Sequence, residues 1–326
     1  MDASRRRPIP VVREGLTLFE NGRGPVGIFG VPMDLGQDRR GVDMGPSAIR
    51  YARLEACLED LGHSVTDLGN AVVPIPEVVA LGERVRHLAA VKSVCEEVSE
   101  RAATIVSEGL FPIFLGGDHA ITIGTVSGIA RSSPAVRTGV IWVDAHADFN
   151  TPATSPSGNI HGMPLATLAG LGHPDLVGIG GPGASVRTED MTIIGLRSVD
   201  VEEKKLLREA GVRVYTMKDI DAYGAARVVR SAIKGLTDVD RVHLSLDLDA
   251  LDPEVAPGVG TPVRGGLTYR EAHLLMELVN EAGIVSSLDV VEVNPILDIK
   301  NGTATLAVEL VESLMGRRII DLPRER

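Results

Sequence analysis

The chain is poor in aromatic residues, which make up 3% of its 326 residues, and it has a single tryptophan. Aliphatic side chains and alanine must therefore supply most of the core. Hydrophobic residues make up 44% of the chain, which is enough for a sizeable core, and the composition shows no signature of disorder. We expect a folded globular protein.

Cysteine and long apolar runs are also scarce. The two cysteines, Cys57 and Cys95, lie far apart in helix-like patterns and match neither a CxxC metal site nor a disulfide framework. We interpret them as buried free thiols in a reducing compartment. No apolar run approaches the ~20 residues of a membrane span, and the N-terminus lacks the apolar core of a signal peptide. We therefore expect a cytoplasmic protein with no membrane partner.

Positive charge is in deficit, since the formal net charge is −11 at pH 7. This balance argues against nucleic acids and anionic membranes as partners. The basic run Arg5–Arg7 is too short to change that conclusion. It lies within residues 1–24, which we expect to form a polar N-terminal lead-in.

From residue 25 to 326 strand-like and helix-like patterns alternate, without repeats or breaks in composition. Strands are expected over 26–31, 64–68, 111–115, 140–143, 191–196, 212–215, 241–247 and 284–291. Helices are expected over 46–62, 83–108, 202–210, 225–235, 268–282 and 303–315, with others beginning near 119 and 164. This alternation predicts a single α/β domain with a mainly parallel central β-sheet flanked by helices on both faces. Sites in such sheets lie at the carboxyl ends of the strands.

Three potential metal ligands follow the apolar strand 140–143 with a period of two: Asp144, His146 and Asp148. In extended backbone this spacing points their side chains to one side. Two carboxylates that flank an imidazole on one face repel each other unless a cation lies between them, so DxHxD favours metal binding. A lone aspartate or histidine, by contrast, is usually a turn former or a structural hydrogen-bonding residue.

Two further stretches, FPIFLGGDHA and VHLSLDLD, deliver acidic and histidine side chains at strand ends. Each is a weaker signal alone, because Asp249 could simply cap the turn that follows it. We leave Asp118 out of the ligand set, since its side chain is better suited to bracing the loop. The predicted ligands are His119, Asp144, His146, Asp148, Asp247 and Asp249.

These six ligands are too many for one four-coordinate zinc. Four carboxylates and two imidazoles without a thiolate suit two harder divalent ions, with Mn²⁺ foremost. Two ions ~3.5–4 Å apart can activate a water molecule between them. The predicted chemistry is therefore hydrolysis at an electrophilic carbon.

Four motifs carry a resemblance to a known family: GGDHA, DAHADFNTPATSPSGNIHGMP, SLDLDALDPEVAPGVGTPVRGGLTYRE and VVEVNP. Together they resemble the ureohydrolase family and, within it, the arginase branch of bacterial type. The resemblance runs from about Gly27 to Gly316, and the loop TPATSPSGNIHG is similar to that of arginases rather than agmatinases. It implies two Mn²⁺ ions, one held by His119 and Asp148, the other by His146 and Asp249, with Asp144 and Asp247 bridging both.

The resemblance also implies hydrolysis of L-arginine to L-ornithine and urea by a hydroxide that bridges the ions, in a homo-oligomer, either trimer or hexamer. Asp148 would bind the hydroxide and pass its proton to the leaving amine, His161 would shuttle protons, and Glu292 would orient the guanidinium. The implied substrate-binding residues are Asn150, Ser155 and Ser157 for the α-carboxylate, Asp200 and, through water, Glu203 for the α-amino group, and Thr261. Ser155 replaces a more common threonine and PGVGTP replaces PGTGTP, and both departures keep the polar groups.

Several alternatives stay open. Glu292 could be a plain strand-end charge, His161 a solvated loop residue, and Asp200 the N-cap of the next helix, alone or in addition to its binding role. For the whole protein the alternatives are another guanidino hydrolase such as an agmatinase, a catalytically silent metal-binding relative, or a binuclear zinc deacylase. The intact set of predicted residues counts against silence, and the arginase-like loop counts against a deacylase.

Overall fold

The computed structural model describes residues 24–82 and 84–320. Within them, eight strands form one sheet in the order β2-β1-β3-β8-β7-β4-β5-β6, and every pairing between these strands is parallel. The bounds are β1 Pro25–Val31, β2 Ser64–Asn70, β3 Phe111–Gly116, β4 Thr138–Val143, β5 Met191–Leu196, β6 Arg213–Thr216, β7 Arg241–Asp247 and β8 Val285–Val291. The predicted single-domain α/β fold with a parallel sheet is confirmed.

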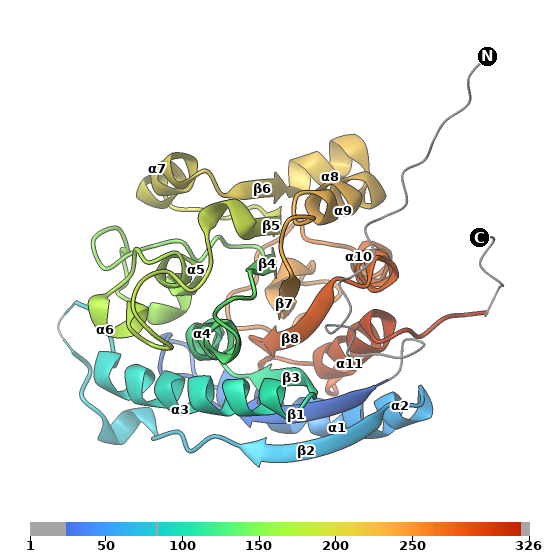
Figure 1. Ribbon diagram of the computed structural model, residues 1–326, viewed down its shortest axis with the longest axis horizontal. Coiled ribbons are helices and arrows are strands. Elements are labelled where there is room, and N and C mark those ends of the chain that lie inside the picture. The colour runs from blue at the N-terminus through green and yellow to red at the C-terminus, as the bar shows by residue number, and fades with distance from the viewer. Residues whose placement is uncertain (1–23, 83, 321–326) are drawn as a thin grey trace.

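Helices cover both faces of the sheet (Figure 1). On one face, five helices pack in one apolar cluster with strand residues such as Val26 and Leu244. These helices are α1 Gly45–Tyr51, α2 Leu54–Asp60, α9 Ala225–Lys234, α10 Tyr269–Ala282 and α11 Gly302–Leu314. On the other face lie α3 Leu88–Ser107, α4 Thr122–Ser132, α5 Pro164–Leu168 and α7 Val201–Ala210, against residues such as Phe114 and Trp142. Two further helices are α6 Pro174–Val177 and α8 Met217–Tyr223.

Some predicted helices differ from those observed. The expected helix 46–62 is divided into α1 and α2, because Arg53 adopts a left-handed φ of 70° between them. The expected helix 83–108 begins only at Leu88, after His87 with φ 49°. Helix α8 was not predicted, although Thr216 and Asp219 form a capping box at its start. Residues 1–23 of the expected lead-in, with Arg5–Arg7, lie outside the described residues.

The order of the strands places the site. The chain builds β1 and β3 on one side and β4, β5 and β6 on the other, and then β7 and β8 fill the gap between β3 and β4. The carboxyl ends of β3, β8, β7 and β4 therefore adjoin, although they come from distant parts of the chain. The strands that precede the three predicted ligand motifs are β3, β4 and β7, so the topology brings the motifs together.

The structure bears on two expectations from composition, the lack of a membrane span and the state of the cysteines. Among the described residues, no helix combines the length and apolar character that crossing a bilayer requires. Both cysteines are free, and Cys95 is buried whereas Cys57 is only half-buried. The prediction of buried thiols therefore holds fully for Cys95 alone.

Candidate metal centre and active site

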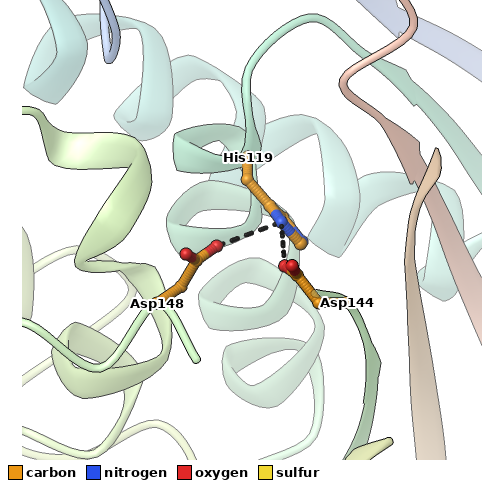
Figure 2. Close-up of side chains that lie close together, drawn as sticks. All are labelled: His119, Asp144 and Asp148. Atoms are coloured by element: carbon orange, nitrogen blue, oxygen red, sulfur yellow. Dashed lines mark ion pairs between the residues drawn. The ribbon is translucent and has the colours of Figure 1, made fainter. Parts of the chain in front are cut away.

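A first cluster of buried ligands surrounds His119, which follows β3. Its Nδ1 atom lies 3.1 Å from an Oδ2 atom of each of Asp144, Asp148 and Asp247. Figure 2 shows two of these carboxylates, which point toward the imidazole from β4 and from the loop after it. The ligand atoms of His119, Asp144 and Asp148 all lie within 4.8 Å of one another. Convergence of this kind is what a shared cation requires.

A second cluster adjoins the first through Asp144. Nδ1 of His146 lies 3.0 Å from Asp249 Oδ2 and 3.4 Å from Asp144 Oδ1. Asp144 thus offers one carboxylate oxygen to each cluster, as a bridging ligand would. Asp247 turns Oδ2 toward the first cluster, while its Oδ1 accepts the backbone N–H of Asp249 at 2.7 Å. Its bridging role therefore stays a prediction.

Neighbouring side chains fix the orientation of His119. The indole of Trp142 stacks on its ring with centroids 3.9 Å apart, and the indole N–H donates to Asp144 Oδ2 at 3.0 Å. The hydroxyl oxygen of Ser245 lies 2.8 Å from Nε2 of His119. Nδ1 is therefore the nitrogen that faces the carboxylates, and the ring has little freedom to turn away.

The clusters hold more negative charge than a buried site tolerates without cations. Burial alone would lower the pKa of His146, but the charge of Asp249 and hydrogen bonds with Asp144 and Asp249 outweigh it and raise this pKa to about 12. Burial would also lower the pKa of His119, but hydrogen bonds with the surrounding aspartates outweigh it. The pKa of His119 therefore lies well above its ordinary value. Burial and the charge of Asp144 raise the pKa of Asp148 to about 6. Divalent cations would relieve the same imbalance.

Two of the predicted catalytic residues have unusual backbone conformations. Asp148 has φ 49° and Glu292 has φ 63°. Residues other than glycine rarely adopt such values, which cost on the order of 1–3 kcal/mol and persist where the surroundings impose them. Here the Asp148 carbonyl accepts from Leu165 N at 3.0 Å, and Glu292 N donates to the Gly117 carbonyl at 2.8 Å. Such strain is typical of functional sites.

Glu292 is buried at the end of β8 and pairs with His161. Its Oε1 lies 3.2 Å from Nδ1 of His161 and accepts from His119 N at 3.0 Å. Burial would raise the pKa of Glu292, but the hydrogen bond and charge of His161 outweigh it, so this pKa is lowered. Burial would lower the pKa of His161, but the hydrogen bond and charge of Glu292 raise it to about 9. Glu292 is thus more than a plain strand-end charge, and His161 is more than a solvated loop residue.

A cavity of about 160 Å³ opens over the clusters. Its wall includes every predicted substrate-binding residue: Asn150, Ser155, Ser157, Asp200, Glu203 and Thr261. The predicted ligands His146, Asp148 and Asp247 and the predicted proton shuttle His161 line it as well. A second hollow, lined among others by Gln37, Asp38 and Arg39, adjoins it and shares His146 and Thr261. The other predicted residues, His119, Asp144, Asp249 and Glu292, contact this set without lining either hollow.

The two serines of the loop after β4 are prepared to donate. Ser155 Oγ accepts from Gly158 N at 3.0 Å, and Ser157 Oγ accepts from Asn159 N at 3.2 Å. Because each oxygen serves as an acceptor in these bonds, the hydroxyl proton remains available to an anion in the cavity. This polarity suits a carboxylate.

Asp200 and Glu203 join the cavity wall to α7. They form a capping box at the start of this helix, so the alternative that Asp200 is an N-cap is confirmed, and it lines the cavity as well. Asn150 Nδ2 donates to Asp200 Oδ2 at 3.0 Å. Burial raises the pKa of Glu203 to about 7, against the hydrogen bonds from Phe149 N and Asp200 N. The two carboxylates therefore lie together in the cavity wall, at the start of α7.

Two residues of the site were not predicted from the sequence. Gln37 is 6% exposed and donates from Nε2 to Glu292 Oε2 at 2.9 Å. Asn159 lines both hollows, and its Oδ1 is buried without a hydrogen-bond partner among the described residues. The only sequence signal for Gln37 was its glycine-rich loop, which Asp118 braces by accepting from Gly36 N at 2.7 Å. The exclusion of Asp118 from the ligand set agrees with this role.

The chemistry of the donor atoms fits a pair of divalent cations. The two ligand groups consist of aspartate oxygens and imidazole nitrogens, share Asp144, and include no thiolate. Oxygen-rich sets with some imidazole suit Mn²⁺ and its harder neighbours better than thiophilic metals. Hydrolysis at a polarised carbon is the reaction such a pair would support.

Comparison with known proteins agrees with this chemistry. The model of the arginase family matches residues 25–316. An arginase of Bacillus caldovelox is 53% identical over 301 residues, covering 91% of this chain and 99% of that protein, and an arginase of Bacillus subtilis is 51% identical over 296 residues, covering 90% and 99%. A solved structure of the Bacillus caldovelox arginase superposes with a TM-score of 0.88 at 52% identity, covering 91% and 99% of the two chains. The chain belongs to the arginase family of hydrolases.

Proposed function

We propose that the protein hydrolyses L-arginine to L-ornithine and urea at a centre of two Mn²⁺ ions. The observation that carries the proposal is the arrangement of two ligand groups joined by Asp144 beneath a polar cavity. The cavity wall offers hydroxyl donors, and a buried glutamate contacts His161 of that wall. The 53% identity to an arginase supports the same substrate.

The six predicted ligands would hold the ions. His119 and Asp148 would belong to one ion, His146 and Asp249 to the other, and Asp144 and Asp247 to both. When bound, such a pair supplies a water molecule acidic enough to act as the nucleophile near neutral pH. Thr261 supports the second set, because its hydroxyl donates to Asp249 Oδ2 at 2.8 Å.

The remaining chemistry belongs to three side chains. Glu292 would pair with the guanidinium and hold its carbon toward the clusters. Asp148 would take the proton of the attacking water and pass it to the leaving amine. His161 lines the cavity and contacts Glu292, so it would exchange the proton with solvent.

The other end of the cavity would recognise the amino-acid groups. Asn150, Ser155 and Ser157 offer neutral donors to the α-carboxylate. Asp200, and Glu203 through water, would take the α-ammonium group. A lone carboxylate for the guanidinium, and a mixed set of neutral donors and carboxylates for the α-carboxylate and α-ammonium groups, would thus fix the direction in which arginine enters.

The cellular setting belongs to the same proposal. We propose one catalytic domain over residues 25–326, a cytoplasmic location, and assembly as a homo-oligomer, either a trimer or a hexamer. The net charge of −11 supports a small-molecule substrate rather than a nucleic-acid partner.

A urea-release assay on L-arginine and agmatine, with and without added Mn²⁺, tests the function. Agmatine has the same guanidinium but lacks the α-carboxylate. Losing two hydrogen bonds to that charged group predicts a preference for arginine of about a hundredfold or more in kcat/KM. Equal rates on both compounds would favour a broader guanidino hydrolase, and no urea from either in Mn²⁺ would favour a silent relative.

A further inference from the structure

The loop that carries Ser155 and Ser157 is held from outside by a segment distant in sequence. Arg84 lies shortly before α3, and its Nε donates to the Pro152 carbonyl at 2.7 Å. Its Nη2 also donates to the Ala153 carbonyl at 3.4 Å. The guanidinium therefore ties down the first half of the loop 150–159.

The same segment contacts the second half of that loop through backbone. Arg86 N donates to the Gly158 carbonyl at 3.0 Å. A β-carbon on Gly158 would lie 2.3 Å from the Arg84 carbonyl oxygen, and Gly158 has a left-handed φ of 75°. Glycine thus permits the close approach one residue away from Ser157, and the N–H of the same glycine donates to Ser155 Oγ.

The side chain of Arg86 adds a charge contact. It pairs with Asp38, whose Oδ2 accepts from Asn159 Nδ2 at 3.4 Å. Asp38 and Asn159 both line the second hollow. Arg86 therefore offsets a negative charge that would otherwise repel a carboxylate bound nearby.

We infer that residues 84–86 are positioning residues, which hold the loop 150–159 in the shape that recognises the α-carboxylate of the substrate. The inference rests on the proposed function and adds a specificity determinant to it. Arg84 and Arg86 contact no reacting group and act through the serines and Asn159. Although the loop has no lysine or arginine of its own, these two cations stabilise it from a different part of the chain.

Arg84→Ala tests the side-chain contact. Without its two hydrogen bonds the loop is ordered for less of the time, so the KM for L-arginine should rise about three- to tenfold while kcat stays within about twofold. Kinetic constants for agmatine and the Mn²⁺ content per chain should not change, because neither depends on the serines. Gly158→Ala should raise the KM for arginine as well, since its β-carbon would push the segment away from the loop.

Two matched variants control for unrelated effects. Arg230→Ala on α9 removes a positive charge that is likewise exposed and makes no side-chain hydrogen bond or ion pair within the described part of the chain. Gly183→Ala imposes a similar backbone strain, because Gly183 has φ 86° and no described atom lies within 4 Å of the added β-carbon. Both should behave like the wild type. The combination of Arg84→Ala with Gly158→Ala should cost less than the sum of its parts, since both changes detach the same segment from the loop.

The Arg86 pair provides a test through charge. Arg86→Ala should raise the KM for arginine more at low ionic strength than at high, because the charge of Asp38 is then uncompensated. Adding Asp38→Asn should restore much of the loss. Agmatine, which lacks a carboxylate, should not respond in this way, and an equal response for both substrates would contradict the inference.

Hydrogen exchange gives a result that does not depend on turnover. The amides of residues 153–155, 157 and 158 should exchange faster in Arg84→Ala than in the wild type and Arg230→Ala. Unchanged exchange together with unchanged selectivity would overturn the inference, and so would a parallel loss of kcat on both substrates. If the wild type released no urea from arginine, the proposed function would fail, whereas the exchange comparison would still decide whether the segment holds the loop.

Discussion

At the scale of single residues, Asp144 is the side chain on which both ligand clusters depend. It lies 3.1 Å from the imidazole of His119 and 3.4 Å from that of His146 through its two separate oxygens. Asp144→Ala removes a negative charge that two cations would share, so we expect urea release to be abolished and the Mn²⁺ content to fall. Elemental analysis alongside the urea assay measures both. Two ions per chain with normal turnover would contradict the binuclear site.

His161 separates proton transfer from metal binding. It lines the cavity and contacts Glu292, yet it belongs to neither of the ligand groups. His161→Ala should therefore retain two Mn²⁺ ions per chain and lose turnover by roughly 10²–10⁴-fold, if proton transfer limits the rate. A parallel loss of metal and activity would instead make His161 a ligand or a structural support.

At the scale of elements, the loop after β4 provides the substrate-recognition surface. Asn150 and Ser157 both line the cavity; Asn150 donates to Asp200, and Ser157 Oγ accepts from Asn159 N. Asn150→Ala combined with Ser157→Ala should reduce the preference for arginine by lowering its kcat/KM about a hundredfold, because two bonds to a charged acceptor are lost. Agmatine turnover should stay nearly constant. Initial rates on both substrates measure this, and a similar loss on each would indicate damage to the centre rather than to recognition.

The strands and the ligand motifs were predictable because their signals are local. β3, β4 and β7 are fully buried: β3 and β4 are mainly apolar, whereas β7 alternates Val242, Leu244 and Leu246 with polar residues. The period of two in Asp144, His146 and Asp148 follows from strand geometry. The break at Arg53 was not predictable, since nothing in the local pattern demands a left-handed residue there. Gln37 and Arg84 escaped for a related reason. Their partners Glu292 and Pro152 lie 255 and 68 residues away, and only the fold brings them together.

At the scale of the whole molecule, the buried clusters couple stability to pH and to metal. Within the metal-free protein, the carboxylates around His119 and His146 outweigh burial and raise both pKa values, that of His146 to about 12. A histidine whose folded pKa exceeds its unfolded value of about 6.5 contributes stability that is complete below that pH and is lost as the pH rises toward the folded pKa. Asp148, whose pKa is raised to about 6, likewise contributes stability that is lost as the pH rises, from its unfolded pKa of about 3.9 to about 6.

Chelated protein should consequently lose thermal stability steadily from about pH 6.5 to pH 9. Protein saturated with Mn²⁺ should not, because its ligands bind cations in place of protons and metal affinity improves as the protons leave. The gap in Tm between the two forms should therefore widen with pH. In chelated His146→Ala the decline with pH should be shallower, because only the proton of His119 is then left to dissociate from the two histidines. Thermal unfolding followed by circular dichroism, with and without chelator across this range, measures the gap. A gap that stayed constant with pH would mean that protons do not substitute for cations in these clusters.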